Sequence, residues 1–300
     1  MTQRSILLCT VGTSLLNPTN FGGKRTANNS TDWETVASDL AAAQPTDRAC
    51  GAEVNSVASL IANAYVSTDA GIYLFHSDTD DGRQIASLLA DLFHARGHSP
   101  VQAIPITDLQ DEDPKRFRTK GLRNLAKAIC GKVRDHSPSA CTINATGGYK
   151  AQIAIAVLLG QALGIPVYYM HERFSEIIAF PPMPVALDFE VWMRASGMLF
   201  DLEHNANPTP AALYAEEWDE KYESLFERVR IDGQDYLELS PTGQIFHETF
   251  RERFRTSRDQ VLPPPASAGQ KRPPRLEQSG WPGQHPEVAA FLEKVTNEIP

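Results

Sequence analysis

The sequence predicts an α/β protein with a Rossmann-like, doubly wound and mostly parallel sheet. Short apolar runs alternate with helical patterns over the first 180 of its 300 residues. Strands that alternate with helices of about 10–15 residues are typical of crossover units in a parallel sheet. Glycines and small polar residues follow several of these runs, at the sheet edge where such folds bind ligands.

The predicted strands are short and apolar. Residues 5–10 (SILLCT) and 71–76 (GIYLFH) are continuous runs, as expected for strands covered on both faces. Further strands are predicted at 101–106, 141–145, 167–170 and 177–179. Helices, identified by apolar residues three and four positions apart, are predicted at 54–65, 84–95, 121–133 and 150–163. Residues 17–50, rich in Asn, Thr and Gly, are expected to be an irregular insertion.

The second half of the chain has a different organisation. We assign residues 1–187 to the first domain and residues 188–258 to a small α+β, winged-helix-like module. This module is expected to contain a helix from 189, a charged helix over 211–228, a hairpin that turns at Asp232-Gly233, and a helix capped by Ser240. Seven prolines make residues 259–286 a predicted extended linker, and residues 287–300 a terminal helix.

Charge and composition exclude several classes of protein. With 28 basic and 37 acidic residues the net charge is −9, which disfavours a basic nucleic-acid-binding protein. No apolar stretch approaches the roughly 18 residues of a membrane span, so we expect a cytoplasmic protein without a membrane partner. The four cysteines form no CxxC pair, and neither a metal nor a cofactor is expected.

Two segments have unbalanced charge. Residues 181–258 carry 8 basic and 15 acidic residues, whereas residues 115–134 carry eight basic residues and no acidic one. The basic run is either a solvated helix face or an electrostatic funnel for a polyanion. The acidic segment is either solvated or suited to a basic or amphipathic protein partner.

Candidate ligand-binding residues follow the predicted strands at one sheet edge. Gly147 and Gly148 open a helix whose free N–H groups can hold an anion, and Lys150 adds a positive charge in its first turn. The full predicted set is Thr10, Gly12, Thr13, Ser14, Ser77, Asp78, Thr79, Asn144, Thr146, Gly147, Gly148 and Lys150. His76 and His171 also follow strands, but we interpret both as capping or core residues.

Common catalytic motifs are missing from the sequence. There is no GxxxxGK[ST] loop, no GxGxxG after the first strand, no GxSxG elbow and no HExxH. The acidic run at 78–81 lacks the spacing and distal Glu of a calcium loop. The Arg-x(4–6)-His pair of HEPN ribonucleases is not found in the second half.

Four motifs together resemble the CARF (CRISPR-associated Rossmann fold) sensors of type III CRISPR systems. They are Val11-Gly-Thr-Ser, Ala52-Glu-Val-Asn-Ser, Ser77-Asp-Thr-x-x-Gly82 and Asn144-Ala-Thr-Gly-Gly-Tyr-Lys150. The resemblance covers residues 1 to about 187 and is most specific at Thr-Gly-Gly-x-Lys. It implies a homodimer that holds a cyclic oligoadenylate, for which we favour cyclic tetra-adenylate as allosteric ligand, between its two sheets. It also implies that the glycines and Lys150 hold phosphates, while Thr10, Thr13 and Ser14 contact ribose or phosphate.

Three functions are compatible with this resemblance. The chain is a sensor that controls an effector ribonuclease, a ring nuclease that cleaves its ligand, or a winged-helix transcription regulator. A RelE-type mRNA interferase, associated with the ribosome, is the favoured effector, and its domain of about 80–100 residues is expected outside this chain. For ring cleavage the candidate catalytic residues are Thr13, Ser14 and Lys150. Sequence-specific DNA binding is not expected, because the net charge of residues 181–258 opposes it.

Overall fold

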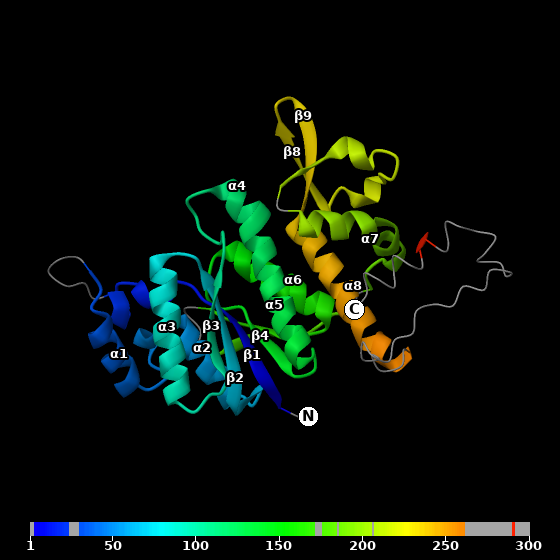
Figure 1. Cartoon of the computed structure of the whole chain (residues 1–300). Coiled ribbons are helices and arrows are strands. Elements are labelled where there is room, and N and C mark those ends of the chain that lie inside the picture. The colour runs from blue at the N-terminus through cyan, green and yellow to red at the C-terminus, as the bar shows by residue number, and fades with distance from the viewer. Residues whose placement is uncertain are drawn as a thin grey trace. The chain divides into compact units, whose positions relative to one another are not determined.

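The computed structural model describes residues 3–23, 30–171, 176–184, 186–205, 207–261 and 290–291. Its main sheet has six strands in the order β3-β2-β1-β4-β5-β6 (Figure 1). The strands are β1 (Arg4–Thr10), β2 (Val66–Ser77), β3 (Val101–Ile106), β4 (Cys141–Asn144), β5 (Val167–Met170) and β6 (Ile177–Phe180). Every pairing is parallel except that of β5 with β6. The predicted Rossmann-like, mostly parallel sheet is confirmed.

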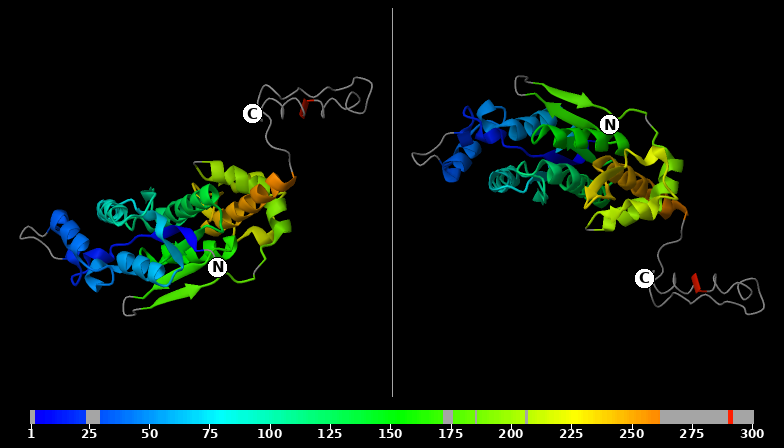
Figure 2. Two further views of the ribbon diagram at one scale, coloured as in Figure 1. Left: turned by 90° about the horizontal axis from the view of Figure 1, so that it is seen from below. Right: turned by 90° about the horizontal axis from the view of Figure 1, so that it is seen from above.

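Helices cover both faces of this sheet (Figure 2). The helices are α2 (Ala52–Ala62), α3 (Asp80–Ala95), α5 (Leu122–His136) and α6 (Lys150–Leu163). Successive residues of β1 point to opposite faces, so Leu7 packs into the cluster under α2 and α3, and Leu8 packs into the cluster under α5 and α6. Because both faces are covered, the strands are continuous apolar runs rather than alternating ones.

The expectation of an irregular insertion over 17–50 is wrong at its centre. Helix α1 (Trp33–Ala42) lies there, flanked by the short turns η1 (Ser14–Leu16), η2 (Phe21–Gly23) and η3 (Arg48–Cys50). Asp32 caps α1 by accepting a hydrogen bond from the Thr35 N–H at 3.2 Å. Val36 and Leu40 are buried in the same apolar cluster as α2 and α3, and this tertiary contact outweighs the polar composition around the helix.

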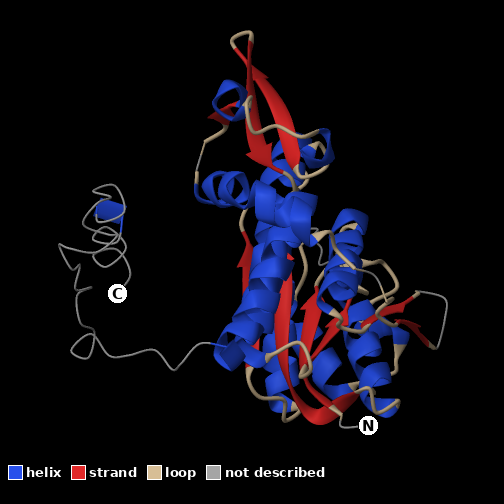
Figure 3. Cartoon of the chain, turned by 90° about the vertical axis from the view of Figure 1, so that its right-hand side faces the viewer, coloured by secondary structure: helices blue, strands red, loops and turns tan. Residues whose placement is uncertain are grey.

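Residues 189–252 form a smaller α+β arrangement on a separate apolar cluster. Helix α7 (Phe189–His204) precedes a three-stranded sheet in the order β7-β9-β8, and α8 (Pro241–Val261) follows it (Figure 3). The small strands are β7 (Thr209–Pro210), β8 (Phe226–Ile231) and β9 (Gln234–Leu239). The hairpin turns at Asp232 and Gly233, both with positive φ, as expected for an Asp-Gly turn.

The helix predicted over 211–228 is wrong. The segment contains two single turns, η5 (Ala211–Tyr214) and η6 (Glu220–Tyr222), and β8 already begins at Phe226. Glu216, Glu217, Glu220 and Glu223 would place like charges three and four residues apart on a helix, which destabilises it. The side chain of Asp219 instead accepts a hydrogen bond from the Lys221 N–H and starts the second turn.

The chain divides into two compact units, Met1–Glu252 and Arg253–Pro300. Helix α8 continues to Val261, so the first three residues of the predicted linker are helical. The rest of the linker and nearly all of the predicted terminal helix lie outside the described residues. The predicted division at residue 187 stays a prediction. Among the described helices, none combines the length and apolar character that a bilayer span requires.

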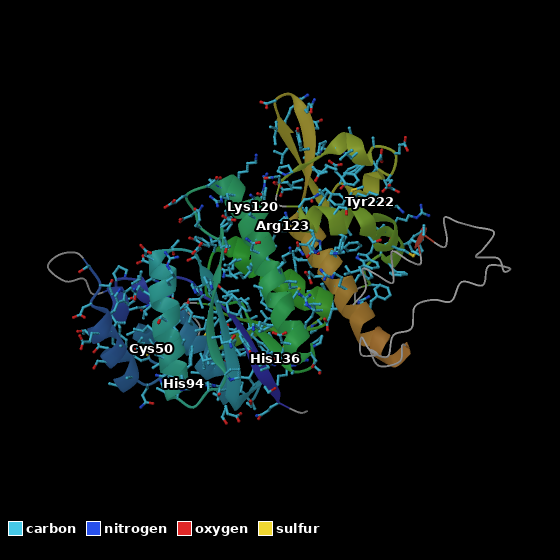
Figure 4. All side chains as sticks on the ribbon, viewed as in Figure 1. Cys50, His94, Lys120, Arg123, His136 and Tyr222 are labelled. Atoms are coloured by element: carbon cyan, nitrogen blue, oxygen red, sulfur yellow. The ribbon has the colours of Figure 1, made fainter. Side chains whose placement is uncertain are left out.

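The basic run lies on α4 (Pro114–Arg116), the π-helical segment η4 (Phe117–Gly121) and α5. Its charges partly face the acidic segment: Arg118 pairs with Glu227 at 3.0 Å, and Lys127 pairs with Glu203 at 3.4 Å. Figure 4 shows Lys120 and Arg123 at one end of α5 and His136 at the other. For these paired residues, the two charge imbalances of the sequence neutralise each other within the chain.

Candidate functional site

The candidate site lies where the chain path reverses direction across the sheet. Strands β1 and β4 are neighbours, with Cys9 opposite Asn144, so their carboxyl ends are level. After β1 the chain leads to α2 on one face, and after β4 it leads to α6 on the other. The loops therefore separate and leave an opening between them, which is where doubly wound sheets bind ligands.

A buried carboxylate shapes the loop after β1. Glu53, in the first turn of α2, is 4% exposed, and its Oε1 accepts a hydrogen bond from the Gly12 N–H at 2.8 Å. Its Oε2 accepts from the Ser14 hydroxyl at 2.5 Å, and that hydroxyl accepts in turn from the Ala52 N–H at 2.9 Å. The positive end of the α2 dipole favours the negative charge of Glu53. Glu53 thus holds the loop after β1 in place through the Gly12 N–H and the Ser14 hydroxyl.

The two glycine segments are in direct backbone contact. A Cβ on Gly12 would lie 2.3 Å from the Gly148 nitrogen, and a Cβ on Gly147 would lie 2.2 Å from Oε1 of Glu53. Gly148 has φ +101, and a Cβ there would meet the side-chain amide of Gln152. Only glycine fits at these positions, because the two loops approach more closely than any side chain permits.

Three of the predicted ligand-binding residues are buried beneath these loops. The Thr10 hydroxyl, 1% exposed, donates to the Gly147 carbonyl at 2.6 Å. Asn144, 2% exposed, donates through Nδ2 to the Ser56 hydroxyl and accepts from the Thr146 hydroxyl at 2.6 Å. Thr146 also accepts from the Met170 N–H at 3.0 Å. In this structure the polar groups of Thr10, Asn144 and Thr146 support the loops; their contact with a ligand stays a prediction.

Gln152 holds the start of α6 in place. Its side chain is fully buried, and it accepts from the Tyr149 N–H at 3.3 Å and donates to the Phe75 carbonyl at 3.2 Å. Because Gln152 satisfies one N–H of the first helical turn internally, an anion at this end of α6 would be held by the remaining N–H groups and by Lys150.

The segment after β2 forms the opposite side of the opening. Thr79 caps α3 by accepting from the Gly82 N–H at 3.1 Å, and its hydroxyl lies 2.9 Å from that of Ser77. Asp78 is exposed and accepts a hydrogen bond from Arg83 at 2.7 Å. Ser77 and Thr79 therefore line the opening, whereas the carboxylate of Asp78 is paired with Arg83.

These segments enclose a cleft of about 440 Å³. Its lining comprises Val11, Gly12, Thr13, Ser77, Thr79, Asp80, Asp81, Asp111, Gly148 and Tyr149. The start of α3 and the loop after β3 contribute three carboxylates to this lining: Asp80 pairs with Arg83, and Asp111 accepts a hydrogen bond from Tyr149, the residue after Gly148. The cleft therefore combines hydrogen-bond acceptors with a close approach to the backbone of the two glycine loops.

Two residues beside the glycine loops remain accessible. Thr13 is exposed and lines the cleft, and Lys150 is exposed at the first position of α6, directly after Tyr149. Burial, followed by the charge of Asp111, raises the pKa of the Tyr149 phenol, which therefore stays neutral at ordinary pH. The edge of the Phe117 ring contacts Tyr149, with ring centroids 5.3 Å apart.

Two titratable groups below the cleft, Cys9 and His76, are held in their neutral forms. Burial raises the pKa of the Cys9 thiol to about 12; the Asn144 hydrogen bond opposes this rise and the charge of Glu53 adds to it. Burial lowers the pKa of His76, whose Nδ1 lies 2.9 Å from the Ser77 carbonyl. His76 is 3% exposed, in agreement with its interpretation as a core residue.

The structure brings five of the twelve predicted residues into one cleft and adds others, whereas Lys150 and six further predicted residues are not part of the lining. Gly12, Thr13, Ser77, Thr79 and Gly148 line one cleft, although they come from three separate segments. The sequence-based set omits Glu53, Gln152, Tyr149, Asp80, Asp81 and Asp111. An acidic residue in the first turn of a helix is an ordinary dipole partner, so nothing local marks Glu53 as the support of a loop 41 residues away. Among the described residues, no group of three or more His, Cys, Asp or Glu side chains is placed to hold a metal ion.

Comparisons with known proteins are consistent with the motifs. Residues 48–183 match the family model described as CRISPR-associated protein (Cas_APE2256). A solved structure of Can2 from Sulfobacillus thermosulfidooxidans in complex with cyclic tetra-adenylate (cA4) shares 10% identity and a TM-score of 0.30. That match covers 86% of this chain and 66% of the Can2 chain, just under two thirds of its length. No curated protein matches.

The family match includes Glu53, the segment after β2 and the whole Asn144–Lys150 loop, while β1 and its glycine loop precede it. The part of the chain that forms most of the site is thus the part that the family model matches. Residues 48–183, just under half of the chain, thus match a CRISPR-associated family model within a Rossmann-like fold, which agrees with the resemblance to CRISPR-associated Rossmann-fold proteins.

Proposed function

We propose that this protein binds a cyclic oligoadenylate, with cyclic tetra-adenylate as the favoured ring, at a cleft shared by two copies of the chain. The observation that carries the proposal is the contact between the Gly12 loop and the Gly147-Gly148 loop at the start of α6, with Lys150 exposed beside it. Such a helix start attracts phosphate through its free N–H groups and its dipole. The CRISPR-associated family of residues 48–183 supports a ligand of this class.

The two walls of the cleft suit different parts of a nucleotide. We place the phosphates at the start of α6 and Lys150, because its N–H groups and the ammonium attract anions, whereas the carboxylates of Asp80 and Asp81 at the start of α3 repel them. Carboxylates accept hydrogen bonds, so the start of α3 suits ribose hydroxyls and the adenine amino group. A ring of four or six units has two-fold symmetry and therefore fits the axis of a symmetric dimer, each copy holding half of the phosphates.

Replacement of Lys150 by alanine tests the phosphate-binding role. We expect K150A to weaken the binding of cyclic tetra-adenylate at least about tenfold, because a charge-assisted contact to phosphate is worth about 1.5–3 kcal/mol. Isothermal titration measures this affinity. The control is K132A, since Lys132 lies on α5 rather than at the start of α6 and pairs with Asp135.

No heat from wild-type protein with either cyclic tetra-adenylate or cyclic hexa-adenylate would contradict the proposal. Equal affinity of K150A and the wild type would retain the ring as ligand but remove Lys150 from the phosphate site.

Ring cleavage is a second candidate, favoured by the position of Thr13. Its side chain is exposed in the cleft, whereas the Ser14 hydroxyl is hydrogen-bonded to Glu53. In such cleavage the ribose 2′-oxygen attacks the adjacent phosphorus, the bond from phosphorus to the 5′-oxygen breaks, and the 2′-hydroxyl proton passes to the leaving 5′-oxygen. The protein would supply alignment of the attacking oxygen and stabilisation of the charge on phosphate.

Labelled ring incubated with stoichiometric protein in EDTA tests this activity. We expect conversion to linear product by the wild type and at least about tenfold slower conversion by T13A, because alignment of the attacking group is lost. S14A serves as the comparison, since it disturbs the Glu53 contact rather than the cleft surface. A ring that stays intact for hours with wild-type protein would exclude cleavage.

We propose that the output of ring binding is control of an effector ribonuclease, for which a RelE-type mRNA interferase remains the favoured class. Residues 189–252 would relay the signal. Part of their acidic charge faces α5, so the surface left for a protein partner is smaller than the sequence indicates. Arg228 is one of the few basic side chains of this segment that could contact DNA. Its guanidinium carbon lies 4.4 Å from the centre of the Trp218 ring, which disfavours a transcription regulator.

A further inference from the structure

We propose that helix α5 transmits ligand binding at the cleft to residues 189–252. Ion pairs centred on the buried side chain of Glu203 connect these residues to α5. This inference rests on the proposed ring binding and adds the route by which that binding alters residues 189–252. The continuous helix formed by η4 and α5 touches two parts of the molecule. Its amino-terminal end contacts the cleft, and one of its sides contacts the acidic segment.

The contact with the cleft is made by Tyr149 and Phe117. Tyr149 lines the cleft between Gly148 and Lys150, and its ring meets the Phe117 ring edge to face, with an interplanar angle of 82°. Phe117 is the first residue of η4, which continues directly into α5. A ligand that presses on Tyr149 therefore acts on the start of this helix. Single π-helical turns are frequent at functional sites.

One side of α5 packs on the sheet. Leu125, Ile129 and Val133 are fully buried in the apolar cluster of that face. At the amino-terminal end, a Cβ on Gly121 would lie 2.5 Å from the Asp108 carbonyl, and Arg116 pairs with the Asp108 carboxylate at 2.5 Å. The helix is thus closely fitted to the loop after β3, whose Asp111 lines the cleft.

The other side of α5 is held by charge. Lys127 pairs with Glu203 of α7, and Arg134 pairs with Glu248 of α8. Arg123 donates to the Leu202 carbonyl at 3.4 Å, and burial lowers the pKa of its guanidinium. These contacts recur at four- and seven-residue intervals, so they form one stripe along the helix.

Glu203 is the centre of this arrangement. Its side chain is 4% exposed and accepts hydrogen bonds from Gln244 and Arg251, both at 2.9 Å, while His247 lies 3.5 Å away. Separating a buried carboxylate from its partners leaves uncompensated charge, which is strongly unfavourable. A shift of α5 therefore moves α7 and α8 with it rather than breaking these pairs.

Trp192 provides an intrinsic reporter of the network. Its indole N–H donates to His247 Nδ1 at 3.2 Å, and the other ring nitrogen of His247 faces Glu203. The chain has three further tryptophans, Trp33, Trp218 and Trp281, which are replaced by phenylalanine so that the emission comes from Trp192 alone. In this background, isothermal titration measures ring binding and fluorescence measures the response of the network to the same additions of cyclic tetra-adenylate.

We expect saturable binding to change the Trp192 emission. F117A, which removes the contact with Tyr149, and K127M, which removes one link between α5 and Glu203, should each reduce the amplitude to less than about half while affinity stays within about threefold. R194A is the control, because Arg194 pairs with Glu190 on the exposed side of α7. Urea unfolding of each variant verifies that it is folded.

The outcomes separate the two proposals. No binding heat contradicts the proposed function. Binding without any change of Trp192 emission contradicts the proposed coupling through α5 but not ring binding. An unchanged amplitude of the emission change in both F117A and K127M does the same.

Discussion

Replacement of Gly12 by alanine is expected to abolish ring binding and to lower the free energy of unfolding by about 1–3 kcal/mol, the usual cost of forcing extra atoms into a packed site. The new Cβ would lie 2.3 Å from the nitrogen and 2.9 Å from the Cα of Gly148. Both are backbone atoms, so no side chain can rotate to make room. Either the Gly12 N–H separates from Glu53, or the Gly147-Gly148 loop moves away.

The matched control is G131A. Gly131 lies within α5, and a Cβ there meets no atom within 4 Å. Alanine is the better helix former by about 1 kcal/mol, so this variant should be as stable as the wild type or more stable. Urea unfolding measures stability and isothermal titration measures ring affinity. G12A protein with wild-type stability and wild-type affinity would show that the contact between the two loops does not shape the site.

Replacement of Glu203 by alanine is expected to cost about 1.5–3 kcal/mol of unfolding free energy, because it removes hydrogen bonds to a buried carboxylate, while the partly exposed Lys127 and Arg251 can be hydrated. Lys127 and Arg251 both pair with this carboxylate, and Gln244 donates to it. The control is E190A on the same helix. The Glu190–Arg194 pair is largely exposed, and such pairs contribute about 0–1 kcal/mol. Equal urea midpoints for the two variants would remove Glu203 from the centre of the interface.

The pH dependence of stability provides a second test of Glu203. Burial alone would raise the pKa of this carboxyl, but hydrogen bonds from His247 and Gln244 and the charges of Lys127 and Arg251 outweigh burial and hold it well below its usual value of 4.5. The folded state thus favours the ionised form. The stabilisation is fully present above the unfolded pKa and is lost as pH falls below it, because the unfolded state then binds the proton more readily.

We therefore expect the unfolding free energy of the wild type to fall more steeply below about pH 4.5 than that of E203Q, which has no proton to bind at this position. Urea unfolding at a series of pH values measures both slopes. Parallel slopes would indicate that another group causes the acid sensitivity. The charged and titratable side chains that face Glu203 are Lys127, His204, His247 and Arg251, and all four are present in both proteins.

Much of the sheet and of the glycine loops could be predicted because the signals are local. The apolar runs of β1 and β2 fall within the predicted ranges, since strands covered on both faces need apolar residues at every position. Gly147, Gly148 and Lys150 stand at a strand-to-helix junction, and the order of elements places that junction at the ligand edge. The hairpin at Asp232-Gly233 follows from two residues that tolerate positive φ.

Helix formation was less predictable where packing and charge compete with propensity. Helix α1 forms in a polar segment because Val36 and Leu40 reach the core, and no helix forms over 211–228 because its acidic residues repel one another. The sequence pattern predicts a helix over 211–228 and none over the residues of α1. Burial of Val36 and Leu40 decides the first case, and repulsion among neighbouring acidic residues decides the second.

By itself the sequence determined the class of fold, the edge of the sheet that carries the site, and the glycines and lysine at that edge. The tertiary structure alone decided that Glu53 holds the loop of Gly12, that three carboxylates line the cleft, and that the basic helix is paired with an acidic segment up to 114 residues away. The physical reason is the separation in sequence between the residues that interact. Strand periodicity and turn chemistry are properties of neighbouring residues, whereas the pairing of two charges distant in sequence depends on where the folded chain places them.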